Sequence, residues 1–375
     1  MKILHVVGAR PNFMKAAPVM RAFSAHEGIM QSLVHTGQHY DANMSDVFFE
    51  QLGLPRPDFD LGVGSGSHAV QTAHVMLRFE EAVLKDRPDL VMVYGDVNST
   101  VAATLVCAKL GIPIAHVEAG LRSFDRTMPE EINRLMTDQI ADLLFTPSSE
   151  GDDNLLREGI APERIHCVGN VMIDTLVRLL PKAQARWPQL SAELGQSLPG
   201  FEANGGYALL TLHRPSNVDH PDGLRDLMAA LEELAEEMPL LFPIHPRTRA
   251  RLQEWNLQPR QKNVHLMEPV GYIDFLALQQ NARLVITDSG GVQEETTFLG
   301  VPCLTARENT ERPVTVTIGT NILVGEDRQK LRDEARRLWK EGISNHQIPP
   351  LWDGRAGERI AAITIPWLQE NQKSC

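Results

Sequence analysis

Two acidic residues stand at the ends of short apolar stretches in the first half of the chain. Asp96 follows the stretch Leu90–Tyr94 after one glycine, and Glu118 directly follows Ile114–Val117. A carboxylate at such a place is costly to bury unless it is solvated, paired with a cation such as Arg122, or used in chemistry. Because parallel strands deliver their carboxyl ends to one edge of a sheet, we expect both acids at that edge and interpret them as a functional pair. Asp96 by itself also fits a plain turn before a helix.

A third acid, Glu130, also has a simple structural interpretation. Thr127 and Glu130 have the spacing of a capping box, with Pro129 in the first turn of the helix. Glu130 and Arg134 are four residues apart, which favours an ion pair along one helix face. These residues therefore leave helix capping and catalysis as open alternatives for Glu130.

Basic residues after the first strand candidate indicate an anion site. Arg10 and Lys15 stand where the apolar stretch Ile3–Val7 gives way to a helix, whose first N–H groups favour an anion. A Gly-Arg-Pro turn with solvated charges is the alternative. The dinucleotide pattern Gly-x-Gly-x-x-Gly is absent at this position, and the glycine-rich residues 62–67 fit a flexible loop.

The second half of the chain carries a similar set of groups. His213, followed by an arginine, ends the apolar stretch Ala208–Leu212 and is a candidate for phosphate binding or acid–base chemistry. Residues 289–291 (Ser-Gly-Gly) open a helix whose N–H groups would bind an anion, although a serine cap with a tight glycine turn is the alternative. Glu295 would then lie near a sugar hydroxyl, and Arg312 offers a further positive charge.

These residues must be positioned by alternating strands and helices. Short apolar stretches separated by amphipathic ones predict an α/β fold with parallel, doubly wound sheets. The strand candidates are residues 3–7, 32–35, 90–94, 114–117, 143–146, 165–168, 208–212, 241–244, 264–266, 284–287 and 301–304. A chain of 375 residues suits two such domains, which we place at 1–169 and 170–356, with a crevice between them and a last helix in 357–375. The polar residues 182–206 predict a loose connection.

Composition excludes several classes of function. The net charge of −12 argues against broad binding of nucleic acid or anionic membranes, and the 6% aromatic content argues against a single-strand stacking surface. Four widely spaced cysteines give no zinc or disulfide pattern. No stretch is long and apolar enough to predict a membrane span or a signal peptide, so we expect a cytoplasmic protein.

Several motifs occur together and in a fixed order. They are Gly-Ala-Arg-Pro at 8–11, Lys15 followed by Ala-Pro at 17–18, Gly-Asp at 95–96, His-Val-Glu-Ala-Gly-Leu-Arg at 116–122, Pro-Glu-Glu-Ile-Asn-Arg at 129–134, Asp-Ser-Gly-Gly-Val-Gln-Glu-Glu at 288–295 and Thr-Glu-Arg-Pro at 310–313. In this combination the chain resembles the non-hydrolysing UDP-N-acetylglucosamine 2-epimerases over nearly its whole length.

The resemblance implies a fold and an activity. The fold would be of the GT-B type, with two Rossmann-like domains and a C-terminal helix that returns to the first domain. The activity would be interconversion of UDP-GlcNAc and UDP-ManNAc, by elimination of UDP to a glycal and readdition. No NAD or other cofactor and no metal would take part. The protein would be a homodimer that serves polysaccharide biosynthesis and has a UDP-sugar as its substrate.

The resemblance also implies roles for individual residues. The catalytic residues would be Asp96, Glu118, Glu130 and His213. The substrate-binding residues would be Arg10, Lys15, Arg134, Phe275, Ser289, Gly290, Gly291, Glu295 and Arg312. Within that set, Glu295 would hold the ribose and Phe275 would line the uracil.

Three departures from the family pattern leave the exact sugar open. Asn12, residues 97–99 and residues 212–216 stand where the family often has Glu, Thr-Thr-Thr and Gly-His-Arg-Arg-Glu. A 2-epimerase of a UDP-2,3-diacetamido-2,3-dideoxyuronic acid is therefore an alternative. A hydrolysing epimerase, a GT-B glycosyltransferase and a nucleotide-sugar-binding regulator are further alternatives. The three acids disfavour the transferase, because sugar transfer needs no proton shuttle at carbon 2.

Overall fold

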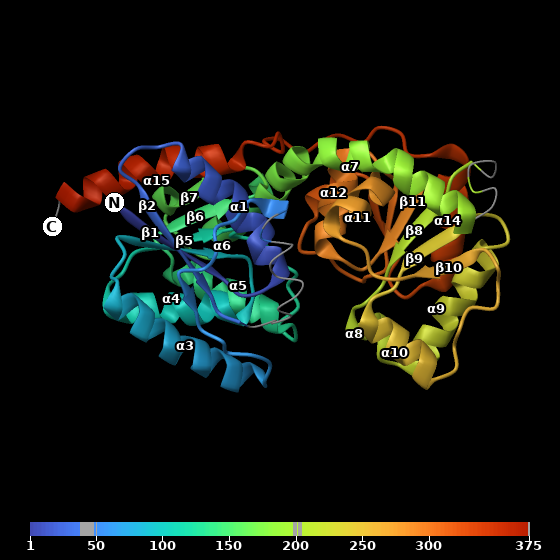
Figure 1. The fold of residues 1–375 in the computed structure, drawn as a ribbon, viewed down its shortest axis with the longest axis horizontal. Helices are drawn as coiled ribbons and strands as arrows, with labels where there is room; N and C mark the ends of the chain where they lie inside the picture. The colour runs from blue at the N-terminus through green and yellow to red at the C-terminus, as the bar shows by residue number, and fades with distance from the viewer. Residues whose placement is uncertain (38–48, 50, 198–200, 202–204, 374–375) are drawn as a thin grey trace. The chain divides into compact units, whose positions relative to one another are not determined.

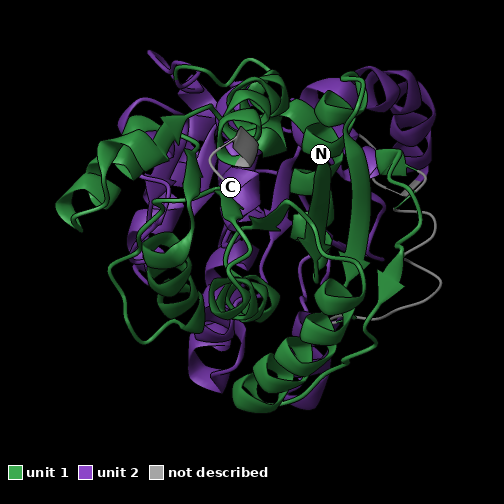
Figure 2. Cartoon of the chain, turned by 90° about the vertical axis from the view of Figure 1, so that its left-hand side faces the viewer, with its two compact units in different colours: residues 1–175, 350–375 green, residues 176–349 purple. Residues whose placement is uncertain are grey.

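The chain forms two compact units. The computed structural model describes residues 1–37, 49, 51–197, 201 and 205–373. Unit 1 comprises residues 1–175 and 350–375, and unit 2 comprises residues 176–349 (Figure 2). The chain passes from unit 1 to unit 2 inside one long helix, and the C-terminal helix belongs to unit 1.

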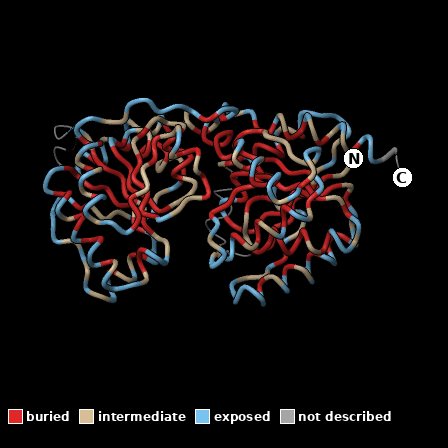
Figure 3. The backbone as a smooth tube through the Cα atoms, turned by 180° about the vertical axis from the view of Figure 1, so that it is seen from behind, coloured by how far each residue is buried: buried red, intermediate tan, exposed pale blue. Residues whose placement is uncertain are grey.

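Unit 1 is built on a seven-stranded parallel sheet with the strand order β3-β2-β1-β4-β5-β6-β7. The strands are β1 (Lys2–Val7), β2 (Met30–His35), β3 (Phe59–Asp60), β4 (Leu90–Tyr94), β5 (Ile114–Val117), β6 (Leu143–Thr146) and β7 (Ile165–Cys167). The central strands are buried along their length, as Figure 3 shows, which explains their continuous apolar sequences. The order reverses between β1 and β4, so the loops after these strands lie at a switch point.

Helices cover both faces of this sheet. They are α1 (Arg10–Ser24), α3 (His68–Lys85), α4 (Asn98–Leu110), α5 (Pro129–Ile140), α6 (Ser149–Arg157) and α15 (Ala356–Lys373). Helices α3 and α4 lie on one side of the sheet and α1 and α15 on the other (Figure 1). Gly357 is needed where α15 meets α1, because a Cβ there would lie 2.8 Å from the Pro18 carbonyl oxygen.

Unit 2 repeats the plan with a six-stranded parallel sheet of order β10-β9-β8-β11-β12-β13. Its strands are β8 (Ala208–Thr211), β9 (Leu240–Pro243), β10 (Val264–Met267), β11 (Leu284–Thr287), β12 (Cys303–Thr305) and β13 (Asn321–Leu323). Its helices are α8 (Pro215–Val218), α9 (Pro221–Leu234), α10 (Pro246–Glu254), α11 (Tyr272–Gln280), α12 (Gly290–Leu299), α13 (Val314–Thr317) and α14 (Arg328–Glu341). The two sheets confirm the predicted α/β class with two Rossmann-like domains.

The prediction of a loose connection over residues 182–206 was wrong for its first part. Helix α7 runs from Val171 to Ser197 and contains two prolines. Leu179, Ala183, Leu190 and Leu194 are buried and recur at helical spacing, so packing of this face outweighs the two missing N–H groups. Among the described helices, none has the length and apolar character to cross a bilayer.

Candidate active site

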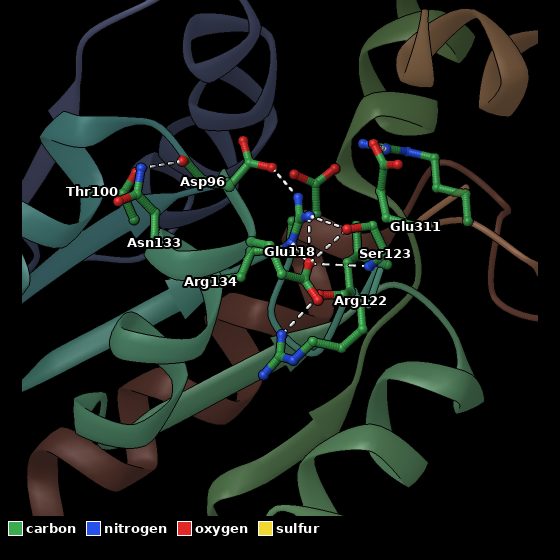
Figure 4. A network of polar contacts seen from close by, with 12 residues as sticks. Asp96, Thr100, Glu118, Arg122, Ser123, Asn133, Arg134 and Glu311 are labelled. Carbon is green, nitrogen blue, oxygen red and sulfur yellow. Dashed lines mark hydrogen bonds and ion pairs between the residues drawn. The ribbon is translucent and has the colours of Figure 1, made fainter. Parts of the chain in front are cut away.

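Asp96 is held from the side by helix α5. Its carboxylate bonds the guanidinium of Arg134, whose side chain is 2% exposed (Figure 4). The Asp96 carbonyl accepts a hydrogen bond from the Asn133 side chain at 2.8 Å. Two consecutive residues of α5 therefore fix both the backbone and the side chain of Asp96.

Arg134 is paired with a carboxylate that the sequence analysis did not single out. Glu131 bonds Arg134 Nε at 3.0 Å and Nη2 at 2.6 Å. Glu131 also accepts the N–H groups of Ser123 and Phe124 and the Ser123 hydroxyl. Burial alone would raise the pKa of Glu131, but the Ser123 N–H and Arg134 lower it below its ordinary value. The signal in the sequence was the spacing of three residues between Glu131 and Arg134.

The structural explanation of Glu130 was wrong. Met128 is the N-cap of α5 with no side-chain cap bond, and the Thr127 hydroxyl donates to Asp125 instead. The predicted ion pair between Glu130 and Arg134 gives way to the pair of Arg134 with Glu131. Glu130 is exposed in the first turn of α5. Capping therefore does not account for Glu130.

Glu118 lies beside the turn that carries Asp96. Its carboxylate bonds the Lys15 ammonium, and both side chains are nearly buried. A Cβ on Gly95 would lie 2.7 Å from Lys15 Nζ and 3.2 Å from Glu118 Oε2, so the pair packs directly on this glycine. The structure thus brings Asp96 and Glu118 to one edge of the sheet, as expected. The possible partner Arg122 is bound elsewhere, to Asp138 and Glu158.

The backbone around these acids is unusual. Glu118 has a φ of 73°, in the left-handed region that the backbone of residues other than glycine rarely adopts. A positive φ held at a non-glycine residue is a feature found at functional sites.

The start of α1 lies next to this turn in the predicted site. Arg10 begins α1 and is exposed, and Asn12 Oδ1 accepts the N–H groups of Gly8 and Ala9 at 3.1 and 3.0 Å.

In unit 2, a buried aspartate organises the corresponding edge. Asp288 accepts the N–H of His213 at 3.0 Å, the N–H of Arg214 at 2.9 Å and the Asn217 amide at 3.0 Å. It also lies 3.1 Å from His213 Nδ1, which orients the imidazole. Burial would raise the pKa of Asp288, but the bond to His213 and that residue's charge lower it. The sequence analysis named His213 and missed this anchor, although Asp288 directly precedes Ser289.

The Ser-Gly-Gly segment forms the start of α12, as predicted. Ser289 is the N-cap and Gly290 the first helical residue. A Cβ on Gly290 would lie 2.5 Å from Arg312 Nη1, so the guanidinium packs against this helix end. Arg312 is held by Glu311 and, at 2.7 Å, by Glu294. A helix N-terminus beside an arginine is suited to bind a phosphate.

Two further predicted residues lie on helices α12 and α11. Glu295 is 3% exposed and accepts the Tyr272 hydroxyl at 2.8 Å. Phe275 is half-buried on α11. In the described ranges, no group of three or more His, Cys, Asp and Glu side chains could hold a metal ion.

The geometry can be compared with known families. Residues 21–364 match the model of the UDP-N-acetylglucosamine 2-epimerase family. The chain belongs to this family. It is therefore an epimerase, and the resemblance seen in the motifs is confirmed.

The relatives of this chain include 2-epimerases named for different UDP-sugars. A UDP-N-acetylglucosamine 2-epimerase of Methanocaldococcus jannaschii is 43% identical over 97% of this chain and 98% of its own length. A UDP-2,3-diacetamido-2,3-dideoxy-D-glucuronate 2-epimerase of Pseudomonas aeruginosa is 44% identical over 96% of this chain and 98% of its own.

A solved structure supports the same assignment. The crystal structure of the Methanocaldococcus jannaschii UDP-GlcNAc 2-epimerase with UDP-GlcNAc and UDP superposes with a TM-score of 0.88 at 43% identity, covering 97% of this chain and 99% of that one. This family member is similar to the present chain in both sequence and fold.

Proposed function

We propose that this chain inverts carbon 2 of a UDP-linked 2-acetamido sugar, converting UDP-GlcNAc to UDP-ManNAc. The observation that carries the proposal is the pair of carboxylates at one sheet edge, Asp96 and Glu118, each bound to a buried cation. Family membership supports the same reaction, since relatives with this activity match almost the whole chain.

The chemistry explains why acids alone can act. The proton on carbon 2 is not acidic in the intact sugar, because no carbonyl stands beside it. When the C1–O bond breaks, its electron pair leaves with UDP and the cationic centre acidifies that proton. A carboxylate removes it to give a 2-acetamidoglucal. A proton is then added to carbon 2 from the opposite face, and UDP returns to carbon 1.

We assign the residues of unit 1 to proton transfer. Asp96, Glu118 and Glu130 supply the carboxylates for the two faces of carbon 2. Arg134 and Lys15 hold two of these acids in place, and Arg10 and Lys15 also contact the diphosphate. Proton transfer requires acids that are held in a fixed position. The buried cations that bind Asp96 and Glu118 therefore support this assignment.

We assign the residues of unit 2 to retention of UDP. The N–H groups at Ser289, Gly290 and Gly291, together with Arg312, bind the diphosphate, and His213 faces it. Glu295 holds the ribose and Phe275 lines the uracil. UDP must stay bound while the glycal exists, so tight retention is part of the reaction.

The test is turnover in deuterated water, followed by NMR. We expect one deuterium at carbon 2 of the product and no net release of UDP. Product without deuterium at carbon 2 would contradict the mechanism. Free ManNAc with released UDP would instead indicate a hydrolysing epimerase, and UDP release that requires an acceptor would indicate a glycosyltransferase.

A second substrate has support from a specific relative. The Pseudomonas aeruginosa epimerase named for a diacetamido uronate matches this chain as well as the UDP-GlcNAc enzymes do. Both UDP-sugars should therefore be offered side by side under the same conditions. A kcat/KM that is higher for the diacetamido uronate would assign the chain to that substrate, with the same chemistry at carbon 2.

We further propose that the chain is a cytoplasmic homodimer. A groove of about 530 Å³ lies between α3, α4 and α5, with Met76, Val101 and Ile132 among its lining residues. Met136 of α5, which also lines this groove, is 40% exposed. An apolar face of this kind fits a second copy of the chain. Light scattering should give the dimer mass, and Met136→Lys in the groove should shift it toward the monomer.

The cytoplasmic assignment has its own support. Within the described residues, Cys107, Cys167 and Cys303 are free thiols, as expected in a reducing compartment. Cell fractionation tests this assignment, and recovery of the chain from a secreted fraction would contradict it.

A further inference from the structure

His116 is buried between two hydrogen-bond acceptors. It lies on β5 and is 0% exposed. Its Nδ1 is 2.6 Å from Asp138 Oδ1, and its Nε2 is 2.8 Å from the Gly95 carbonyl oxygen. Neither partner is a member of the proposed set of catalytic acids, but Gly95 immediately precedes Asp96.

The two partners fix the orientation of the imidazole. A backbone carbonyl can only accept, so Nε2 of His116 must carry a proton. Asp138 also receives the Gly120 N–H at 3.1 Å and Arg122 Nη1 at 2.7 Å, both of which favour its carboxylate form. His116 therefore joins the Asp138 carboxyl group to the Gly95 carbonyl through its two ring nitrogens.

Asp138 connects this imidazole to the second catalytic turn. Gly120, which donates to Asp138, lies two residues after Glu118. Glu118 has a left-handed backbone that must be held by its surroundings. The N–H groups of Glu118 and Ala119 both donate to the Phe145 carbonyl at 3.0 Å, so the whole turn is fixed from its backbone.

We propose that His116 and Asp138 are positioning residues for both carboxylates at the sheet edge. The Nε2–H group of His116 holds the Gly95 carbonyl and so the turn that presents Asp96, and Asp138 holds the Gly120 N–H and so the turn that presents Glu118. This inference rests on the proposed function, because it concerns the orientation of the acids that carry out the proton transfers.

Two substitutions at His116 separate a positioning role from a merely structural one. The amide of His116→Gln reaches the place of Nε2 and can still donate to Gly95. The amide of His116→Asn reaches the place of Nδ1 and can still donate to Asp138, but it loses Gly95. A misplaced catalytic group costs on the order of 100-fold in rate. We expect that loss in kcat for His116→Asn and a clearly smaller one for His116→Gln, with KM little changed in both.

Asp138→Ala and Glu158→Ala form a matched pair in the same network. Glu158 bonds Arg122 at 2.7 and 2.8 Å, and among the described residues no hydrogen bond joins its side chain to either turn. Both variants break an ion pair of Arg122, and thermal unfolding measures how much stability each loses. We expect kcat to fall about 100-fold only for Asp138→Ala, because this variant removes the acceptor of the Gly120 N–H. Equal kcat values in the two variants, or a His116→Asn variant as active as His116→Gln, would overturn the proposal.

A measurement on the unmodified protein needs no variant to fold. ¹⁵N NMR of the histidine-labelled chain should show a proton on Nε2 of His116, the ring nitrogen that faces the Gly95 carbonyl, and an Nε2 without a proton would overturn the proposal. Failure of the proposed function is distinguishable, because it would appear as a wild-type chain that turns over no UDP-sugar while the ¹⁵N spectrum still reports the proton on Nε2.

Discussion

The two units share one topology but carry different groups at the corresponding edge of the sheet. Each sheet reverses its strand order beside its first strand, between β1 and β4 in unit 1 and between β8 and β11 in unit 2. In unit 1 this edge carries carboxylates that are each tied to a buried cation, Asp96 to Arg134 and Glu118 to Lys15. In unit 2 it carries a histidine and a helix end, both anchored by acids behind them.

Two buried aspartates, one in each unit, show how neighbouring side chains change a pKa. Asp174 of unit 1 accepts the N–H groups of Ala356 and Gly357 at 3.0 and 2.7 Å, and Asp288 of unit 2 accepts those of His213 and Arg214. Burial raises the pKa of Asp174 to about 6, whereas His213 and the further hydrogen bonds lower that of Asp288. Equivalent backbone contacts therefore give opposite shifts, and the neighbouring side chains decide the sign.

The largest effect should come from removing an acid of unit 1. Glu118→Gln keeps the shape of the side chain but removes the carboxylate that Lys15 binds. We expect kcat to fall by about 10²- to 10⁴-fold, the usual contribution of a positioned acid or base, while UDP binding by calorimetry stays close to that of the wild type.

The control for this prediction is at the other end of the same strand. Asp142 accepts the Ile114 N–H at 2.8 Å, where β5 begins, and lies outside the proposed site. Asp142→Asn should leave turnover unchanged. Equal losses of kcat in the two variants would mean that unit 1 needs its acids for structure alone. The proposed difference in role between the two units would then be wrong.

The next effect concerns the pH dependence of stability. The folded-state pKa of Asp174 lies above its unfolded value, so the protonated form is favoured by folding. Its contribution to stability is present at low pH and is lost as pH rises from about 4 to about 6, by up to about 3 kcal/mol. Asp174→Asn keeps an oxygen for the N–H groups of α15 and should remove this loss. Denaturant titrations of both proteins across that pH range measure the free energy of unfolding. If it changes with pH equally in the two proteins, the prediction is wrong.

Unit 2 should respond in binding more than in chemistry. Arg312→Gln removes the guanidinium that packs against the start of α12. Because hydrogen bonds to charged groups contribute about 1.5–3 kcal/mol, we expect UDP affinity to fall roughly 10- to 100-fold. Arg332→Gln on the surface of α14, where Arg332 pairs with Glu233, is the matched control and should bind UDP normally. An unchanged affinity of Arg312→Gln for UDP would contradict the proposal that Arg312 binds the diphosphate.

The sequence was sufficient to predict the sheets and the residues at their edges. Strands β4, β5 and β11 are buried on both faces, so their apolar sequences are continuous and their ends are sharply marked. The edge strands β3 and β13 have only two and three residues and leave no such pattern. The polar composition of residues 182–206 suggested a loose connection, but the buried face of α7 dominates as far as Ser197.

The partners of the edge residues could not be predicted in the same way. Lys15 and Glu118 are 103 residues apart, and Asp174 and Gly357 are 183 apart. Such pairs are created by packing of the chain and not by spacing along it. Even the local choice of Arg134 between Glu130 and Glu131 depended on the Ser123 and Phe124 N–H groups, which gather around Glu131 from another segment.

The smallest expected effect compares one helix start in each unit. In unit 2, the Asp327 side chain caps α14 by accepting the Lys330 N–H at 2.9 Å, whereas Thr127 of unit 1 stands before α5 without capping it. Asp327→Ala should lower the free energy of unfolding by about 1 kcal/mol, the usual value of a lost cap. Thr127→Ala should change it by less than about 0.5 kcal/mol, as expected for a surface position. Urea titration measures both, and a loss in Thr127→Ala equal to that in Asp327→Ala would restore the capping box and with it the purely structural explanation of Glu130.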